Sequence, residues 1–303
     1  MKWVVALAVL AACDTTPPPT VCNGHAELCS RPYNQVAFPG THDAYASVAN
    51  GVYAHDQTYS LTRQLQDGVR VLHLEIVPNN GDPWLCHAIC GLGGQSLVSA
   101  LQEVRAFLDA NQTEVVTLLT ESSQITTDQI ADAFDAADLK KLARGHTLGQ
   151  PWPTLGAMIQ NGERVVVFHA DQSSTGGSTF DWMLDRFEWT WETPWDNETS
   201  TDFARCDADR GTKGNSIYVV DNYLENLLVE TPDNAALTNE NPFLIDRLLH
   251  CQQTESTLPN FVMVNYYEVG DVFHDVDVLN GFASPPNGDL SQFPPSSFDG
   301  GTD

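Results

Sequence analysis

Short apolar segments alternate with amphipathic ones along most of this chain, and this alternation limits its fold more than any other feature. About eight segments have the length and composition of strands, and several of the stretches between them have helical spacing of apolar residues. Such alternation indicates an α/β protein with a parallel sheet, and a (β/α)8 barrel requires eight strands. A doubly wound open sheet is the alternative. The expected strands are residues 36–38, 69–77, 84–86, 114–121, 164–170, 187–193, 216–224 and 260–267.

Helices are expected between these strands. The helix expected at residues 60–68 ends at Gly68. The helix expected from residue 126 onward begins with Thr126 or Thr127 as its cap. In the helix expected at residues 96–111, Leu97, Leu101 and Val104 share one face at helical spacing. The expected helices are residues 60–68, 96–111, the stretch from 126 onward, and 241–253.

The amino terminus has the composition of an export signal, with one Lys, an apolar run and small residues before Cys13. The run is too short to span a bilayer. Leu-Ala-Ala-Cys at residues 10–13 resembles the lipobox of bacterial lipoproteins, in which the cysteine receives a lipid. We therefore expect a signal peptide at residues 1–12, removed on export to the cell envelope or the medium. A plain secretory signal is the alternative.

The remaining chain divides by composition. Residues 13–21 contain a Thr- and Pro-rich stretch that predicts a flexible tether between an anchored Cys13 and the folded domain. The domain itself is expected at residues 22–283. Residues 284–303 are rich in Pro, Ser, Gly and Asp and predict a flexible extension. We expect a monomer.

Six cysteines remain when Cys13 is set aside, and an even number suits an oxidising compartment. We predict the pairs Cys22–Cys29, Cys86–Cys90 and Cys206–Cys251, although spacing alone allows other connectivities. A zinc site is the competing interpretation, and the absence of any CxxC pair in the sequence argues against it.

The charge of the chain excludes one class of partner. It has 14 Lys and Arg against 40 Asp and Glu, a formal net charge of -26. Nucleic-acid binding needs clustered cations for the phosphates, so we expect no nucleic-acid partner. The same charge disfavours tight docking on an anionic bilayer.

Polar residues recur where the expected strands end. In a barrel these carboxyl ends meet on one face, so the side chains are expected to converge. His73 and Glu75 are two residues apart and therefore share one face of their strand. The strand-end residues are His42, Asp43, His73, Glu75, His87, Glu121, His169, Asp171, Asp221, Asn222, Tyr223 and Asn265.

This set has the chemistry of phosphodiester cleavage. Asp43, Glu75 and Glu121 offer the hard oxygen ligands that Ca²⁺ or Mg²⁺ prefers. His42 and His87 remain as proton carriers, one to deprotonate a hydroxyl and one to protonate the leaving oxygen. A bound cation would offset charge at phosphorus, and the shortage of Lys and Arg favours a metal in that role.

Several segments together resemble the X domain of phosphatidylinositol-specific phospholipases C, particularly the secreted bacterial branch. They are CNGHAELCSRPYNQVAFPGTHDAYAS, QLQDGVRVLHLEI, WLCHAIC, NQTEVVTLLTE, WPTLGAMI with RVVVFHA, and PNFVMVNYYEVGDVFHDVDVLNG, in order over most of residues 22–281. The resemblance implies a TIM-like barrel. It implies that His42 is the general base towards the inositol 2-hydroxyl. It also implies that His87 is the general acid for the diacylglycerol oxygen, giving a cyclic phosphate.

The family divides on how the phosphate charge is neutralised, and the resemblance implies a metal here. Metal-free bacterial members have Asp-x-Arg at the end of the second strand, whereas calcium-dependent members have Glu-x-Asp. This chain has His73-Leu74-Glu75 there. The implied ligands are therefore Asp43, Glu75, Glu121 and His73, with Ca²⁺ preferred over Mg²⁺. The alternative keeps Asp43 as the hydrogen-bond partner of His87, as in metal-free relatives.

Other positions differ from the family or match it only loosely. Ala88 stands where Gly commonly follows the second histidine, and Asn265 where many relatives have Asp. Asp221, Asn222 and Tyr223 are the candidates for substrate binding. The sequence thus predicts a metal-assisted phosphodiesterase acting on a phospholipid. Two alternatives stay open: a glycerophosphodiesterase-like activity on a soluble or non-inositol diester, and a catalytically weak surface lipoprotein that binds a glycan or lipid headgroup.

Overall fold

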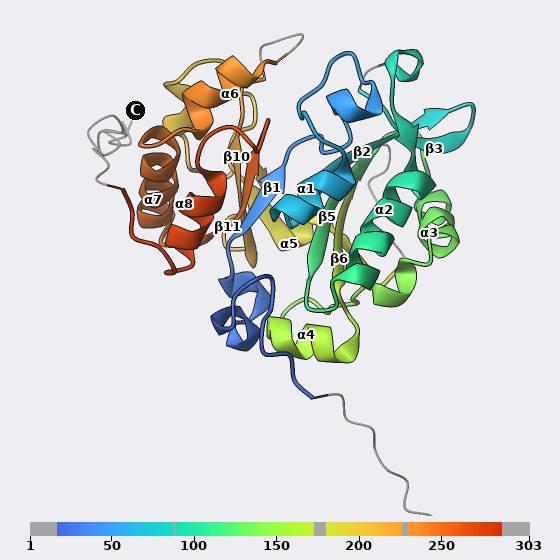
Figure 1. Cartoon of the computed structure of the whole chain (residues 1–303), viewed down its shortest axis with the longest axis horizontal. Helices are drawn as coiled ribbons and strands as arrows, with labels where there is room; N and C mark the ends of the chain where they lie inside the picture. Colours follow the sequence, from blue (N-terminus) through green and yellow to red (C-terminus); the bar gives the residue numbers. More distant parts are fainter. Residues whose placement is uncertain (1–16, 88, 173–179, 226–229, 287–303) are drawn as a thin grey trace, which may run out of the picture.

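A computed structural model describes residues 17–87, 89–172, 180–225 and 230–286 (Figure 1). The predicted signal peptide, the lipidation candidate Cys13 and most of the predicted carboxyl-terminal extension lie outside these residues. Within the described parts of the chain, no helix combines the length and apolar character needed to cross a bilayer.

The described strands form one curled, mainly parallel sheet in the order β7-β6-β5-β2-β1-β11-β10-β8-β9. In this order only β9 is antiparallel to its neighbour. The first and last barrel strands, β1 and β11, pair directly, so the ends of the domain meet. Because β7 and β9 end the order, the barrel is open between these two edge strands. The strands are β1 (Phe38–Thr41), β2 (Val71–Asn79), β5 (Val116–Ser122), β6 (Val165–Asp171), β7 (Met183–Asp185), β8 (Thr190–Glu192), β9 (Arg210–Gly211), β10 (Ile217–Asn222) and β11 (Pro259–Val264).

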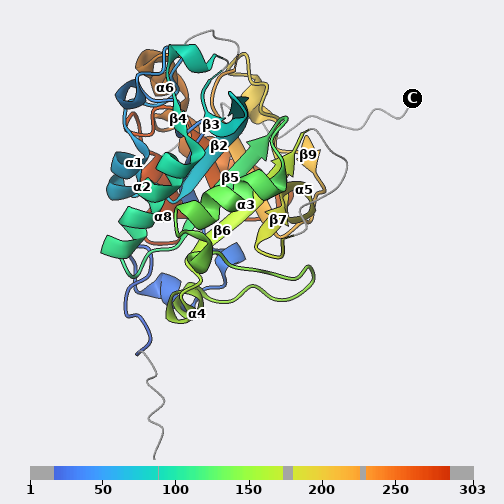
Figure 2. The ribbon, with the colours of Figure 1, turned by 90° about the vertical axis from the view of Figure 1, so that its right-hand side faces the viewer.

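Helices cover the outside of this sheet. Figures 1 and 2 show α2 and α3 along β2, β5 and β6, whereas α7 and α8 cover β10 and β11. Local sequence sets their ends as expected: Ser60 and Gly68 cap the first helix, and Thr126 forms a capping box with Gln129 in the third. The helices are α1 (Leu61–Asp67), α2 (Leu97–Ala110), α3 (Thr127–Ala136), α4 (Leu155–Asn161), α5 (Arg186–Trp189), α6 (Pro232–Asn239), α7 (Phe243–Glu255) and α8 (Val272–Leu279).

Alternation along the strands divides the apolar residues between two cores. On β2, Leu72 and Leu74 belong to the outer core beneath the helices, while Val71 belongs to the core inside the barrel. His73 and Glu75 follow Val71 at two-residue steps and therefore face the interior, where they line a pocket. The prediction that these two share a face is confirmed.

Two strand predictions were right only in part. Residues 84 and 85 do lie in a strand, β3 (Asp82–Leu85), but it forms an antiparallel hairpin with β2 and pairs with β4 (Gln95–Ser96), away from the barrel. The barrel strand that replaces it is β7, whose three residues are too few to show a period. Residues 187–193 are divided between α5 and β8, because the carboxylate of Asp185 accepts from two amides and starts a helical turn before the strand.

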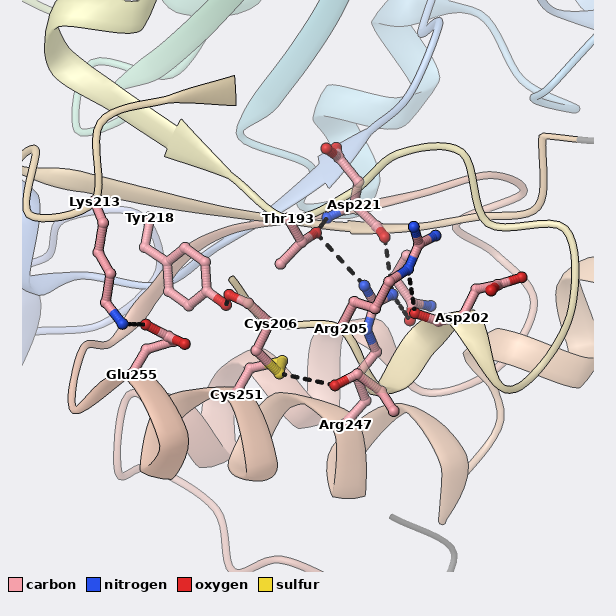
Figure 3. The surroundings of a disulfide bond; sticks show 12 residues. Thr193, Asp202, Arg205, Cys206, Lys213, Tyr218, Asp221, Arg247, Cys251 and Glu255 are labelled. Carbon is pink, nitrogen blue, oxygen red and sulfur yellow. Dashed lines mark hydrogen bonds and ion pairs between the residues drawn. A yellow bond between two sulfur atoms is a disulfide. The ribbon is translucent and has the colours of Figure 1, made fainter. Parts of the chain in front are cut away.

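All three predicted disulfides are present: Cys22–Cys29, Cys86–Cys90 and Cys206–Cys251. Figure 3 shows the last of these, which ties the loop before β10 to α7. Beside it, Tyr218 donates its hydroxyl hydrogen to the carbonyl oxygen of Cys206 (2.8 Å). The disulfide therefore fastens α7 to the loop between β8 and β9, and the Tyr218 hydrogen bond fastens that loop to β10.

Candidate active site

One pocket of about 380 Å³ opens at the carboxyl ends of the barrel strands. It brings together both candidate catalytic histidines and all four candidate metal ligands, although they come from different strands and loops. Such convergence is expected of this architecture. The lining residues are His42, Asp43, Ala54, Asp56, His73, Glu75, His87, Glu121, Gln172, Trp195, Arg210, Tyr223, Leu224, Glu225 and Glu230.

His42 directly follows β1, and its backbone amide donates to the carbonyl oxygen of Val264 (3.0 Å). Its ring is stacked between those of Tyr223 (3.9 Å between centroids) and His73 (5.3 Å). Its Nδ1 lies 3.1 Å from Oδ1 of Asn265. Burial lowers the pKa of His42 to about 4, against the opposing charge of Asp43. The ring is therefore neutral at pH 7 and able to accept a proton.

His87 lies in the short loop closed by the Cys86–Cys90 disulfide. Its Nδ1 is 2.8 Å from the carbonyl oxygen of Ala54 and 3.6 Å from Oδ2 of Asp56. A carbonyl can only accept, so Nδ1 donates to it. Asp56, rather than Asp43, is thus the acidic residue whose carboxyl group lies nearest to Nδ1 of His87.

Asp43 contacts His73 instead. Nδ1 of His73 lies 3.0 Å from Oδ1 of Asp43, and its Nε2 lies 3.6 Å from Oε1 of Glu121. Burial alone would lower the pKa of His73, but the two carboxylates raise it to about 9. His73 therefore bridges two of the expected metal ligands.

The electrostatic surroundings of Glu75 indicate whether a cation would fit in the pocket. Burial, together with the charges of Asp43 and Glu121, raises the pKa of this half-buried carboxyl. A divalent cation among three carboxylates would relieve that repulsion, and hard oxygen donors are what Ca²⁺ and Mg²⁺ prefer. Ligand atoms lie within 4.8 Å of one another in two groups, His42–Asp43–His73 and Asp43–Asp56–His87, and both groups include Asp43. In their chemistry, the three carboxylates Asp43, Glu75 and Glu121 fit a hard divalent cation.

Arg210 is a pocket cation that sequence reasoning did not select, because its strand, β9, has only two residues and shows no periodicity. Its guanidinium lies 2.8 Å from Glu192 and 3.9 Å from both Glu121 and Asp221. It reaches the pocket because β9 runs close to β8: a Cβ on Gly211 would lie 2.1 Å from the carbonyl oxygen of Thr190. These acidic neighbours already offset its charge.

The three candidates for substrate binding have different surroundings. Tyr223 lines the pocket and covers one face of His42. Asp221 is buried beside Arg210 and outside the set of lining residues. The side chain of Asn222 is fully buried and donates to the carbonyl oxygen of Thr238 (3.0 Å). Of the three, Tyr223 is the one placed to contact a ligand.

Sequence reasoning also missed three acidic residues of the pocket: Asp56, Glu225 and Glu230. All three lie in loops, where no pattern marks a buried position. Burial raises the pKa of Glu225 and that of Glu230 to about 7. His169, by contrast, does not line the pocket; its Nδ1 lies 2.9 Å from the hydroxyl of Thr120.

Comparison with known proteins identifies the family. The profile of the family described as PI-PLC X 1 matches residues 28–280. The chain belongs to the PI-PLC X family. It is 31% identical to the PI-PLC X domain-containing protein 1 of the fungus Arthroderma benhamiae, covering 92% of this chain and 96% of that protein. A PI-PLC X domain-containing protein of Arabidopsis thaliana is 28% identical over 88% of this chain, which spans 66% of the plant protein.

Solved structures of this family share the fold. The phosphatidylinositol-specific phospholipase C of Listeria monocytogenes superposes with a TM-score of 0.53 and 14% identity, covering 83% of this chain and 94% of that one. The enzyme of the same name from Staphylococcus aureus gives a TM-score of 0.56 at 13% identity, covering 82% and 93%. The expected TIM-like α/β barrel is confirmed.

Proposed function

We propose that this protein is a metal-assisted phosphodiesterase of the phospholipase C type that acts on a phosphoinositide-like lipid. The observation that carries the proposal is the placement of two histidines and three carboxylates in one pocket at the carboxyl ends of the strands. Membership of the PI-PLC X family supports phosphodiester chemistry, and the geometry supports a division of roles between the two histidines.

His42 is the proposed general base. Nδ1 of His42 faces the side-chain oxygen Oδ1 of Asn265, so Nε2 is left to take the proton of the attacking hydroxyl. By family resemblance this is the inositol 2-hydroxyl. As that oxygen forms its bond to phosphorus, the bond from phosphorus to the glycerol oxygen breaks. His87, whose Nδ1 donates to Ala54, gives a proton from Nε2 to the departing oxygen. A cyclic phosphate and diacylglycerol result.

Asp43, Glu75 and Glu121 would hold a divalent cation, Ca²⁺ in preference to Mg²⁺, and His73 would lie beside it. Such an ion supplies positive charge that offsets the charge developing on the phosphate oxygens. Arg210 cannot easily take that role, because Glu192 and Asp221 surround its guanidinium.

Apolar side chains beside the pocket favour a lipid substrate over a soluble diester. We call Val48, Tyr53, Ile89 and Leu92 the apolar rim. Between half and 70% of the surface of each is exposed. The two segments that carry them are joined, since the amide of Tyr53 donates to the carbonyl oxygen of Leu92 (3.0 Å). Because Ala54 and His87 line the pocket next to them, the apolar rim would meet the acyl chains of a lipid.

Export belongs to the same proposal. Three disulfides suit an oxidising compartment, and a matched protein of Arthroderma benhamiae bears the name "Uncharacterized secreted protein". A lipid on Cys13 would hold the barrel near its substrate.

Phosphorus NMR tests the activity directly. The purified protein is incubated with phosphatidylinositol, glycerophosphoinositol and glycerophosphocholine, with and without a chelator. A cyclic inositol phosphate from phosphatidylinositol, lost with the chelator, is the expected result. Turnover of glycerophosphocholine instead would establish the glycerophosphodiesterase alternative, and no turnover of any diester would favour a binding protein.

Replacing Glu75 by Gln is expected to weaken Ca²⁺ binding by at least roughly tenfold, because affinity follows the number of charged ligands. Calorimetric titration of the chelator-treated protein measures this. Glu188→Gln is the matched control, since Glu188 is exposed and outside the pocket. Equal affinity in both variants, or no Ca²⁺ binding by the unaltered protein, would contradict the metal assignment.

The double variant Tyr53→Ser/Ile89→Ser tests the apolar rim. We expect roughly tenfold slower cleavage of phosphatidylinositol in zwitterionic vesicles, because each replacement removes apolar area from the membrane contact. Cleavage of a short-chain monomeric substrate should be nearly unchanged. Leu148→Ser, at an exposed site away from this pocket, is the control. An equal loss on both substrates would show that the rim does not act through the bilayer.

A further inference from the structure

Asn265 presents two chemically different ends to its surroundings, and the buried groups around it determine which end faces His42. It directly follows β11 and is buried. Its Oδ1 lies 3.1 Å from Nδ1 of His42, and its Nδ2 donates to Oδ1 of Asp56 (3.4 Å) and to Oε2 of Glu230. The amide thus lies between one imidazole and two carboxyl groups.

The next residue, Tyr266, fixes the backbone at both acidic residues. Its backbone amide donates to the main-chain carbonyl oxygen of Asp56 (2.8 Å), and its hydroxyl donates to the main-chain carbonyl oxygen of Glu230 (2.7 Å). Only 6% of the surface of Asp56 and 3% of that of Glu230 are exposed, so neither side chain can turn to solvent.

Hydrogen-bond chemistry then allows one orientation of the amide. Above its raised pKa of about 7 the carboxylate of Glu230 can only accept, so the amino end of Asn265 must face it, and the second amino hydrogen points to Oδ1 of Asp56. Its carbonyl end therefore faces His42 and accepts a proton from Nδ1. A neutral imidazole carries one ring proton, which leaves Nε2 of His42 as the free acceptor. With the amide reversed, its amino group would favour the proton on Nε2.

We propose that Glu230, together with Asp56, is a positioning residue that fixes the Asn265 amide and thereby the tautomer of His42. The effect on catalysis rests on the proposed function, in which His42 needs a free Nε2 to act as a base. The effect on the tautomer of His42 does not depend on that function. Glu230 acts through Asn265 and needs no contact with the substrate.

The first measurement is the tautomer of His42, read from the ring-nitrogen shifts of labelled protein without substrate. The unaltered protein is expected to carry the proton on Nδ1. In Glu230→Gln the amide of residue 230 can donate as well as accept, so a fraction with the proton on Nε2 should appear. Glu225→Gln, in the same pocket and with the same direction of pKa shift, should leave the tautomer unchanged. An unchanged tautomer in Glu230→Gln overturns the proposal.

The second measurement is a double-variant cycle on kcat/KM. With Asn265 present, Glu230→Gln should lower kcat/KM roughly tenfold, about the worth of one hydrogen bond, with KM little changed. Asn265→Asp places a carboxylate beside Glu230, and there the same Glu230→Gln change removes repulsion and should raise kcat/KM. A merely structural role would lower activity in both backgrounds, so that result also overturns the proposal.

The two measurements separate the failures. If the unaltered protein cleaves no diester, the proposed function falls, and the tautomer still decides the role of Glu230. If Glu230→Gln does not fold, Asn265→Ala tests whether the amide controls the tautomer. Because that variant lacks the acceptor for Nδ1, a fraction of His42 with the proton on Nε2 should appear. A fixed tautomer in that variant would show that the amide does not control it.

Discussion

Alanine in place of His42 is expected to lower kcat/KM for phosphatidylinositol by roughly 10² to 10⁴-fold, the range of one general base. The neighbouring His73 is a poor substitute, because it is held between Asp43 and Glu121, and these carboxylates raise its pKa to about 9. His87→Ala should cause a loss of similar size on the natural substrate. Initial rates at saturating metal, with His274→Ala on the exposed face of α8 as control, measure both.

The leaving group distinguishes the two histidines. An aryl phosphodiester of inositol releases a phenolate that needs no proton, so His87→Ala should recover most of its activity on that substrate. His42→Ala should lose as much activity as before, because the attacking hydroxyl still has to give up its proton whatever the leaving group. If both variants responded alike to the aryl group, the assignment of base and acid would be wrong.

Arg186→Met is expected to cost about 3 to 5 kcal/mol of unfolding free energy, a large share of the stability of a typical domain. Its guanidinium is buried and binds Glu192 through two nitrogens, at 2.6 and 3.0 Å. Without it, the fully buried Glu192 keeps only the edge of Arg210 as a cationic partner among the described contacts. Urea unfolding of the oxidised protein, followed by fluorescence, measures the difference.

Arg105→Met is the matched control for this change. Arg105 pairs with Asp109 and Asp138, whose side chains are about half exposed, so the loss should be within about 1 kcal/mol. Arg186→Met/Glu192→Met should regain part of the stability by removing the uncompensated charge. Equal losses in the two single variants would mean that the buried pair contributes no more than a surface pair.

The strands that the sequence predicted well are those buried on both faces. Residues 114–121 and 164–170 are nearly continuous apolar runs, and β5 and β6 lie within two residues of them. Strand β7 was missed because its three residues lie in a segment rich in aromatic side chains. A period needs more residues than that to be visible.

The residues of the site also divide into those that the sequence pattern predicts and those that it does not. His42, His73, Glu75 and Glu121 lie in or directly after predicted strands, where a polar residue on an apolar run can be recognised. Asp56 and Glu230 lie in loops, and Arg210 lies in the two-residue strand β9; their positions depend on contacts distant in sequence, such as that between Tyr266 and Glu230. Their burial, which gives them chemical meaning, is a property of the assembled fold.

If the protein is exported as proposed, the Cys86–Cys90 bond would keep it inactive until then. His87 is held within a loop that this bond closes, whereas His42 is fixed by the barrel itself. The cytosol keeps thiols reduced. A chain that folds before export would then carry a placed base but an unplaced acid, and the lipids of the producing cell would be spared. Oxidation outside the cell would complete the site, so that arrival in the oxidising compartment would itself be the activating event.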